Sequence, residues 1–177
     1  MTDTRDMNAL GDDEFRAEIR SWVEANYPEE LRYFPRRILT AECREWYLKL
    51  SEKGWLCPVW PKEYGGTGGG LAQRRVFQEE CRVRELPFLL PNALQMVGPV
   101  LMKFGTEEQK QRYLPKLASG EHVGAFGLTE PDHGSDAGGL KTRAKKVDGG
   151  YRLNGAKMWI TSSPIADTFV VWAKDEA

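Results

Sequence analysis

Hydrophobic residues in the first two thirds of the chain recur at the three- and four-residue spacing of amphipathic helices. In residues 12–27 this spacing joins Phe15, Ile19 and Val23 behind an acidic first turn. Pro28 ends the segment, because proline cannot continue a helix interior. The pattern therefore predicts a first helix with one face in the core.

A second helix is predicted with Thr40 as its N-cap and Gly54 as its stop. Its apolar stripe is Trp46, Tyr47 and Leu50. Residues 56–70 follow, and they are too rich in glycine and proline for regular structure. They lack the spacing of a phosphate-binding loop, so we expect a loop packed on the helices by Trp60 and Tyr64.

A third helix is predicted over residues 72–85 and a fourth over residues 92–104. We expect the third to turn Val76, Phe77, Cys81 and Val83 inward, and the fourth to bury Leu94, Val97, Leu101 and Phe104. Pro99 predicts a kink or interruption in the fourth helix.

A fifth helix is predicted to begin at Thr106, whose spacing to Gln109 is that of a capping box. Pro115 should break this helix into a final turn, which Gly120 then closes.

From residue 123 onward, short apolar or alternating segments are separated by turn formers. Strands are expected at residues 125–129, 142–147, 151–153, 157–161 and 168–173. Residues 148–150 and 154–155 have the composition of hairpin turns. The predicted fold is α+β, with an N-terminal all-α domain over residues 1–122 and an antiparallel β domain over residues 123–177. Residues 168–173 would need a partner strand on each side, so we expect this β domain to be truncated.

Composition narrows the classes of function. The chain has 177 residues, with 25 basic and 26 acidic side chains, and is 41% hydrophobic, which suits one or two globular units. Near-balanced charge argues against a nucleic-acid partner. No run of apolar residues is long enough to span a membrane. The N-terminus has no leader pattern, so a cytoplasmic location is expected.

The sequence contains few residues that could form a metal site or a histidine-based catalytic triad. Cys43, Cys57 and Cys81 are odd in number and widely spaced, which favours reduced thiols. His122 and His133 are the only histidines. We therefore expect no metal site.

Two segments carry the candidate chemistry, residues 126–136 and residues 157–161. A flavin needs an aromatic wall for its flat ring and hydrogen-bond donors at its edge. If residues 157–161 formed a strand, Trp159 and Thr161 would share one face and could supply both. The alternative is that these are ordinary core residues and turns, in which Glu130 and Asp136 make loop hydrogen bonds.

The order of several motifs resembles the acyl-CoA dehydrogenase family, whose members use FAD to desaturate acyl-CoA thioesters. The motifs are residues 64–68 (Tyr-Gly-Gly-Thr-Gly), 105–110 (Gly-Thr-Glu-Glu-Gln-Lys), 113–115 (Tyr-Leu-Pro), 128–131 (Leu-Thr-Glu-Pro), 134–136 (Gly-Ser-Asp) and 151–161. The resemblance implies that FAD contacts eight residues, namely Phe126, Leu128, Thr129, Gly134, Ser135, Trp159, Ile160 and Thr161. It also implies that Ser135 lies close to the acyl-CoA.

The resemblance carries further expectations. Family members have a longer β domain and a C-terminal helical domain, which supplies the catalytic glutamate. No residue of this chain matches that glutamate, so no catalytic residue is expected here, and the chain alone should be inactive. An electron-transfer flavoprotein or similar acceptor and a homo-oligomeric state are also implied. The rivals are a flavin monooxygenase or oxidase on the same fold and a non-catalytic assembly module.

The substrate within this family is a separate question. Residues 127–131 and 154–167 look most like glutaryl-CoA dehydrogenases, whereas the helical part looks more like bacterial dehydrogenases of other acyl-CoAs. Glutaryl-CoA dehydrogenases hold the distal carboxylate of the substrate with an arginine followed by serine. Residues 86–88 (Leu-Pro-Phe) stand at the equivalent place and contain neither. A monocarboxylic acyl chain is therefore expected.

Overall fold

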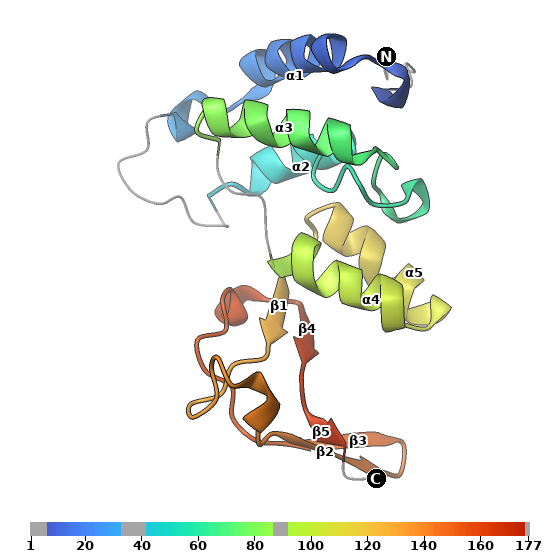
Figure 1. Ribbon diagram of the computed structural model, residues 1–177, viewed down its shortest axis with the longest axis vertical. Helices are drawn as coiled ribbons and strands as arrows, with labels where there is room; N and C mark the ends of the chain where they lie inside the picture. Colours follow the sequence, from blue (N-terminus) through green and yellow to red (C-terminus); the bar gives the residue numbers. More distant parts are fainter. Residues whose placement is uncertain (1–6, 33–41, 87–91, 176–177) are drawn as a thin grey trace.

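The computed structural model describes residues 7–32, 42–86 and 92–175, with helices at one end and strands at the other (Figure 1). The α-helices are α1 Asp12–Asn26, α2 Arg44–Glu52, α3 Leu71–Val83, α4 Gly98–Phe104 and α5 Glu107–Ala118. A π-helical segment, Asn92–Val97, leads into α4. The predicted Thr40 cap lies outside the described residues.

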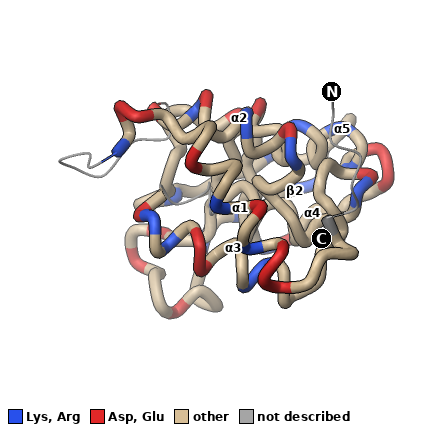
Figure 2. Tube along the Cα trace, turned by 90° about the horizontal axis from the view of Figure 1, so that it is seen from above, with Lys and Arg blue, Asp and Glu red and all other residues tan. Residues whose placement is uncertain are grey.

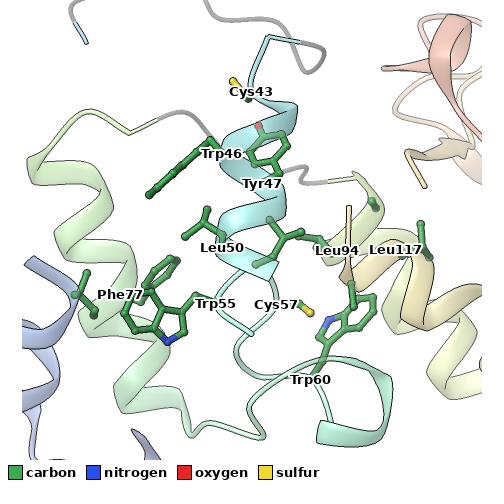
Figure 3. Packing of buried hydrophobic residues seen from close by; sticks show 14 of the residues in the cluster. Cys43, Trp46, Tyr47, Leu50, Trp55, Cys57, Trp60, Phe77, Leu94 and Leu117 are labelled. Atoms are coloured by element: carbon green, nitrogen blue, oxygen red, sulfur yellow. The ribbon is translucent and has the colours of Figure 1, made fainter. Parts of the chain in front are cut away.

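Aromatic side chains fill the core of the helical part, as Figure 3 shows. The indole of Trp55 is fully buried, and its ring centroid lies 5.1 Å from that of Trp22 and 5.9 Å from that of Phe77. Phe15 meets the same indole edge-on at 6.1 Å. Such offset and edge contacts add to the burial of a large apolar area, which is why α1, α3 and the loop after α2 pack around this ring.

The loop after α2 is also packed as expected, because Trp60 and Tyr64 are both buried. A Cβ at Gly66 would overlap the Trp60 carbonyl, so only glycine fits that turn. A Cβ at Gly98, in the first turn of α4, would overlap the Trp60 indole. Glycine at both positions therefore lets the loop approach α4 closely.

Ion pairs join α1 to α3. Glu80, only 1% exposed, accepts hydrogen bonds from Arg16 (2.8 Å), Arg20 (3.0 Å) and Arg84. Figure 2 shows basic and acidic residues close to one another around α1 and α3. The prediction for Val83 was wrong, because it is 74% exposed at the end of α3. The inward stripe of that helix continues from Val76 and Phe77 to Glu80 instead.

Pro99 marks an interruption, as the sequence predicts, and the π-helical segment ends just before it. The missing N–H of Pro99 thus falls where π-helical hydrogen bonding changes to α-helical hydrogen bonding. Leu94 and Val97 are buried and Leu101 packs against the core, but Phe104 is 70% exposed, contrary to expectation. Phe104 is the last residue of α4 and lies beyond the core, with the Lys103 ammonium 5.2 Å from its ring centroid.

The capping box at the start of α5 is confirmed. Gln109 N–H donates to Thr106 Oγ1 at 3.2 Å, and Thr106 N–H donates to Gln109 Oε1 at 2.9 Å. The predicted break at Pro115 was wrong, because α5 continues to Ala118. Leu114, Leu117 and Ala118 are buried, and this packing outweighs the one hydrogen bond that proline removes.

The β part contains two small sheets, and the α+β class is confirmed. Strand β1 (Gly124–Gly127) pairs parallel with β4 (Thr168–Val171). Strand β2 (Arg143–Val147) pairs antiparallel with β3 (Gly150–Asn154) and parallel with β5 (Lys174–Asp175). Only the β2–β3 hairpin has the predicted antiparallel direction. Long stretches of chain separate β1 from β4 and β2 from β5, and they let the second strand of each pair run parallel to the first.

Residues 157–161 do not form the predicted strand, and the predicted hairpin turn at residues 154–155 is also wrong, because β3 ends at Asn154 and no strand follows directly. Met158 N–H donates to the Thr129 carbonyl at 3.0 Å, and no strand ladder extends from this bond. Trp159 has a φ of 58°, and Ser162 one of 66°, so the backbone turns through the left-handed region instead of running extended.

Candidate functional site

The two candidate segments meet at one buried carboxylate. Glu130 is 5% exposed and follows β1 by three residues. Its Oε1 accepts hydrogen bonds from Thr142 N–H at 2.9 Å and from Lys157 Nζ at 2.8 Å, and its Oε2 accepts one from Lys141 N–H at 2.5 Å. Glu130 therefore fastens the segment before β2 and the segment after β3 to the end of β1.

Lys157 makes a second contact with the same segment. Its Nζ donates to the Leu128 carbonyl at 3.0 Å, while the next residue, Met158, donates its N–H to the Thr129 carbonyl. Two successive carbonyls are thus occupied from the side of residues 157–158. In the described part of the chain, Thr129 N–H donates to no acceptor.

The electrostatics explain the ionisation state of this carboxylate. The hydrogen bond from Lys141 N–H, followed by those from Lys157 and Thr142, holds the pKa of Glu130 well below its ordinary value. Both carboxylate oxygens accept hydrogen bonds from the chain. A group that is ionised and fully engaged is unsuited to take a proton from a substrate. The loop-hydrogen-bond role considered for Glu130 is thus the one it plays.

The turn after Glu130 is held by its own backbone. Glu130 N–H donates to the His133 carbonyl at 3.0 Å, and His133 N–H returns a bond of 3.2 Å. A Cβ on Gly139 would overlap the His133 ring, so the end of this turn approaches the imidazole closely. Gly134 and Ser135 are exposed, with open space around the Gly134 Cβ position. Backbone at these two residues is accessible to a ligand.

The aromatic residue of the second segment stands in solvent. Trp159 is 84% exposed, and its positive φ is a strained conformation for a bulky side chain. Thr161 is exposed as well, and its carbonyl accepts from Asn92 Nδ2 at 3.3 Å, which links this loop to the helical part. The structure thus rejects the interpretation of Trp159 as an ordinary core residue.

The other predicted site residues lie nearer the core. Ile160 and Leu128 are partly buried. Phe126, also partly buried, meets Trp172 edge-on at a centroid distance of 5.9 Å. The structure brings residues 126–130 and 157–161 together, but the shared strand face expected for Trp159 and Thr161 is absent.

Sequence reasoning missed the residues that join the two segments. Lys157 and Glu130 were not predicted to pair, and Asn92 was placed only in a helix. The available signal was that residues 126–136 carry only acidic charged side chains, Glu130 among them, whereas the one charged side chain of residues 157–161 is the basic Lys157. Among the described residues, no three His, Cys, Asp or Glu side chains gather in a way that could hold a metal ion.

Comparison with known proteins gives this geometry a context. Residues 11–121 match the acyl-CoA dehydrogenase N-terminal domain, and residues 125–177 match the middle domain. The chain belongs to the acyl-CoA dehydrogenase family. This confirms the resemblance predicted from the motifs.

Curated relatives of this chain include proteins from plants and bacteria. The mitochondrial isovaleryl-CoA dehydrogenase of Arabidopsis thaliana is 47% identical over 118 residues, which cover 66% of this chain and 29% of the relative. An acyl-CoA dehydrogenase of Bacillus subtilis is 41% identical over 128 residues, 71% of this chain and 34% of the relative. The chain therefore spans about a third of the length of these relatives.

Solved structures of similar fold cover nearly the whole chain. The ChsE4–ChsE5 complex of Mycobacterium tuberculosis contains a chain with a TM-score of 0.80 and 31% identity, covering 93% of this chain and 42% of that one. A glutaryl-CoA dehydrogenase of Mycobacterium smegmatis has a TM-score of 0.75 and 33% identity, covering 95% and 44%. One glutaryl-CoA dehydrogenase structure, at 28% identity and a TM-score of 0.73, is in complex with FADH2.

Within residues 7–32, 42–86 and 92–175, no helix combines the length and the apolar character needed to cross a bilayer.

Proposed function

We propose that this chain is the cofactor-facing N-terminal portion of an FAD-dependent acyl-CoA dehydrogenase that desaturates acyl-CoA thioesters between Cα and Cβ. The observation that carries the proposal is the junction of residues 128–130 with residues 157–158, which holds Trp159 strained and exposed beside it. Strain in an exposed bulky residue is expected where a ligand uses the conformation.

The chemistry of the site fits a flavin. Trp159 offers an uncovered aromatic face, and Thr129 offers a backbone N–H without an acceptor in the described chain. The residues that would hold FAD are those expected from the resemblance, namely Phe126, Leu128, Thr129, Gly134, Ser135, Trp159, Ile160 and Thr161. When bound, FAD accepts the hydride removed from the Cβ of the substrate. Ser135, exposed at the turn, would contact the acyl-CoA.

The α-proton of the substrate must go to a base other than Glu130 and Asp136. Glu130 is fully hydrogen-bonded, and Asp136 is exposed at the turn, with its Oδ2 3.7 Å from His133 Nδ1. We propose that a glutamate of a C-terminal domain is the base in the natural-length protein, by which we mean the whole dehydrogenase of which this chain is the proposed N-terminal portion. This assignment is the one that the family resemblance implies. A 177-residue polypeptide should then show no turnover.

Substrate, partners and organisation are parts of the same proposal. A monocarboxylic acyl chain is favoured because residues 86–88 lack the arginine and serine expected for a diacid, although residues 87 and 88 lie outside the described part of the chain. An electron-transfer flavoprotein or similar acceptor, a homo-oligomeric assembly and a domain boundary near residue 122 follow from the family. The cytoplasmic location stays a prediction.

One observation supports a second candidate function. The prolyl acyl carrier protein oxidase AnaB has a TM-score of 0.77 and 28% identity to this chain. The same fold therefore also supports an oxidase. Rapid reoxidation of the reduced flavin by oxygen would favour oxidase chemistry, and slow reoxidation with transfer to a flavoprotein acceptor would favour a dehydrogenase.

The experiment for the main proposal uses the natural-length protein purified with FAD. We expect bound flavin, and bleaching of its visible absorbance on anaerobic addition of an acyl-CoA. Bound flavin that no acyl-CoA reduces would contradict the dehydrogenase. Absence of flavin would favour the non-catalytic module.

A further inference from the structure

We propose that Lys157 is a positioning residue that fixes the 128–129 peptide group, so that the Thr129 N–H is presented to a hydrogen-bond acceptor of the bound flavin nucleotide. The inference rests on the proposed FAD site and adds a residue outside the eight expected to contact the cofactor.

The argument begins with the planarity of the peptide group. In a trans peptide the carbonyl of one residue and the N–H of the next point in opposite directions. Lys157 Nζ holds the Leu128 carbonyl at 3.0 Å. The Thr129 N–H, on the other side of the same peptide group, must therefore point away from Lys157.

The neighbouring peptide group is fixed independently. Met158 N–H holds the Thr129 carbonyl, and the N–H of that peptide group, which belongs to Glu130, donates to the His133 carbonyl. Every other polar group of these two peptide units thus has a partner within the chain, and only the Thr129 N–H lacks one among the described residues. The Thr129 N–H is oriented but unpaired, and the Thr129 carbonyl holds Met158, the residue before the exposed Trp159. Such an N–H suits an acceptor on a flat aromatic ligand.

Glu130 restrains the lysine. The Lys157 side chain is 13% exposed, and its ammonium lies 2.8 Å from Glu130 Oε1, whose carboxylate is itself held by two backbone N–H groups. A charged group with two fixed acceptors has little freedom to release the Leu128 carbonyl. The apolar side chain of methionine, which is of similar length, would leave that carbonyl without its donor.

The test compares Lys157→Met, Lys157→Arg and a control, Lys145→Met, in the natural-length protein stripped of FAD. Lys145 lies exposed on β2 and makes no side-chain hydrogen bond or ion pair in the described chain. Titration with FAD measures Kd, and hydrogen–deuterium exchange of residues 126–131 is measured without FAD.

We expect Lys157→Met to raise the Kd for FAD by about tenfold or more. This is the effect of losing one well-oriented hydrogen bond, that of the Thr129 N–H to FAD, once Lys157 no longer fixes the peptide group. Lys157→Arg should recover most of the affinity, and Lys145→Met should bind as the wild type does. Residues 126–131 should exchange faster in Lys157→Met alone. If Lys157→Met fails to fold, Lys157→Gln, which keeps a donor but not the charge, replaces it with a smaller expected loss.

Wild-type affinity in the folded Lys157→Met variant, with unchanged exchange at residues 126–131, would overturn the proposal while leaving the FAD site intact. Equal losses in Lys157→Arg and Lys157→Met would also overturn it, because the role would then depend on packing. If the wild type binds no FAD, the proposed function fails, and the positioning role fails with it.

Discussion

Lys157 and Glu130 lie 27 residues apart in the sequence, yet Nζ of the lysine is 2.8 Å from Oε1 of the glutamate. Both side chains are largely shielded from solvent, with exposed fractions of 13% and 4%. The pair closes a loop that contains the β2–β3 hairpin, and it places the two segments of the candidate site against each other.

The glutamate of this pair can be tested through the loop that it anchors. Glu130→Ala removes the acceptor of the Lys141 and Thr142 N–H groups and leaves Lys157 without its carboxylate. We expect a lower midpoint of thermal unfolding and faster proteolysis within residues 131–142. Asp132→Ala, which removes only an exposed ion pair to Lys141, is the matched control. Equal proteolysis in both variants would show that Glu130 does not anchor the loop.

Glu80 predicts a pH dependence of stability. Its hydrogen bonds, that from Arg20 first, lower its pKa to about 2 from an ordinary 4.5. Because folding lowers this pKa, the stabilisation is complete above about pH 4.5 and is lost as the pH falls toward 2. Glu80→Gln should therefore be less stable than the wild type by about 2 kcal/mol at pH 7, with the difference shrinking below pH 4.5.

Urea unfolding at several pH values measures this difference. Glu24→Gln, at an exposed position outside the first turn of α1 and without an ion pair in the described chain, should change the free energy of unfolding by less than about 0.5 kcal/mol at any of these pH values. A constant difference between wild type and Glu80→Gln down to pH 2 would contradict the role of the carboxylate charge.

Gly98 predicts a steric effect between α4 and the loop after α2. A Cβ at this position would overlap the Trp60 indole, so Gly98→Ala should destabilise the protein by about 1–3 kcal/mol, as overpacking usually does. Gly150→Ala is the control, because nothing lies within 4 Å of its Cβ position and its φ lies outside the left-handed region. Chemical denaturation would measure both, and equal stabilities would show that Trp60 can move aside without cost.

Substrate preference is tested by kinetics in the natural-length protein. Without an arginine in residues 86–88, the enzyme should have a higher kcat/KM for a monocarboxylic acyl-CoA than for glutaryl-CoA. Arg84 is not available as a substitute, since its guanidinium is paired with Glu80. A preference for glutaryl-CoA would point to another cation, with the exposed Arg82 the first to test by Arg82→Ala.

The helices were predictable because burial in an amphipathic helix repeats with the helical period. Phe15, Ile19 and Val23 lie inward as their spacing indicates. The pattern failed at helix ends, where Val83 and Phe104 continue the period but project past the core. It contains no information on how far the core extends along a helix.

The sequence predicted which two segments form the candidate site. It did not predict the backbone conformation of residues 157–161 or the contacts that join the two segments. The alternation around Trp159 fits a strand, yet the backbone there is set by Met158 and Lys157 bonding to the end of β1. Such partners are distant in sequence, so local spacing cannot reveal them. The parallel direction of β4 against β1 has the same origin, because it depends on the path of the intervening chain.

The flavin site itself is tested most directly by an equilibrium titration of the FAD-free, natural-length protein with FAD, followed by quenching of flavin fluorescence. We predict saturable binding by the wild type and by Phe104→Ala, which removes an exposed aromatic far along the chain. Trp159→Ala should bind more weakly by about 1 kcal/mol or more. Trp159→Gly should bind FAD as weakly as Trp159→Ala does. Glycine adopts the positive φ of this position without strain, so weak binding in this variant does not reflect a strained backbone. Wild-type affinity in both Trp159 variants would contradict the assignment of this site.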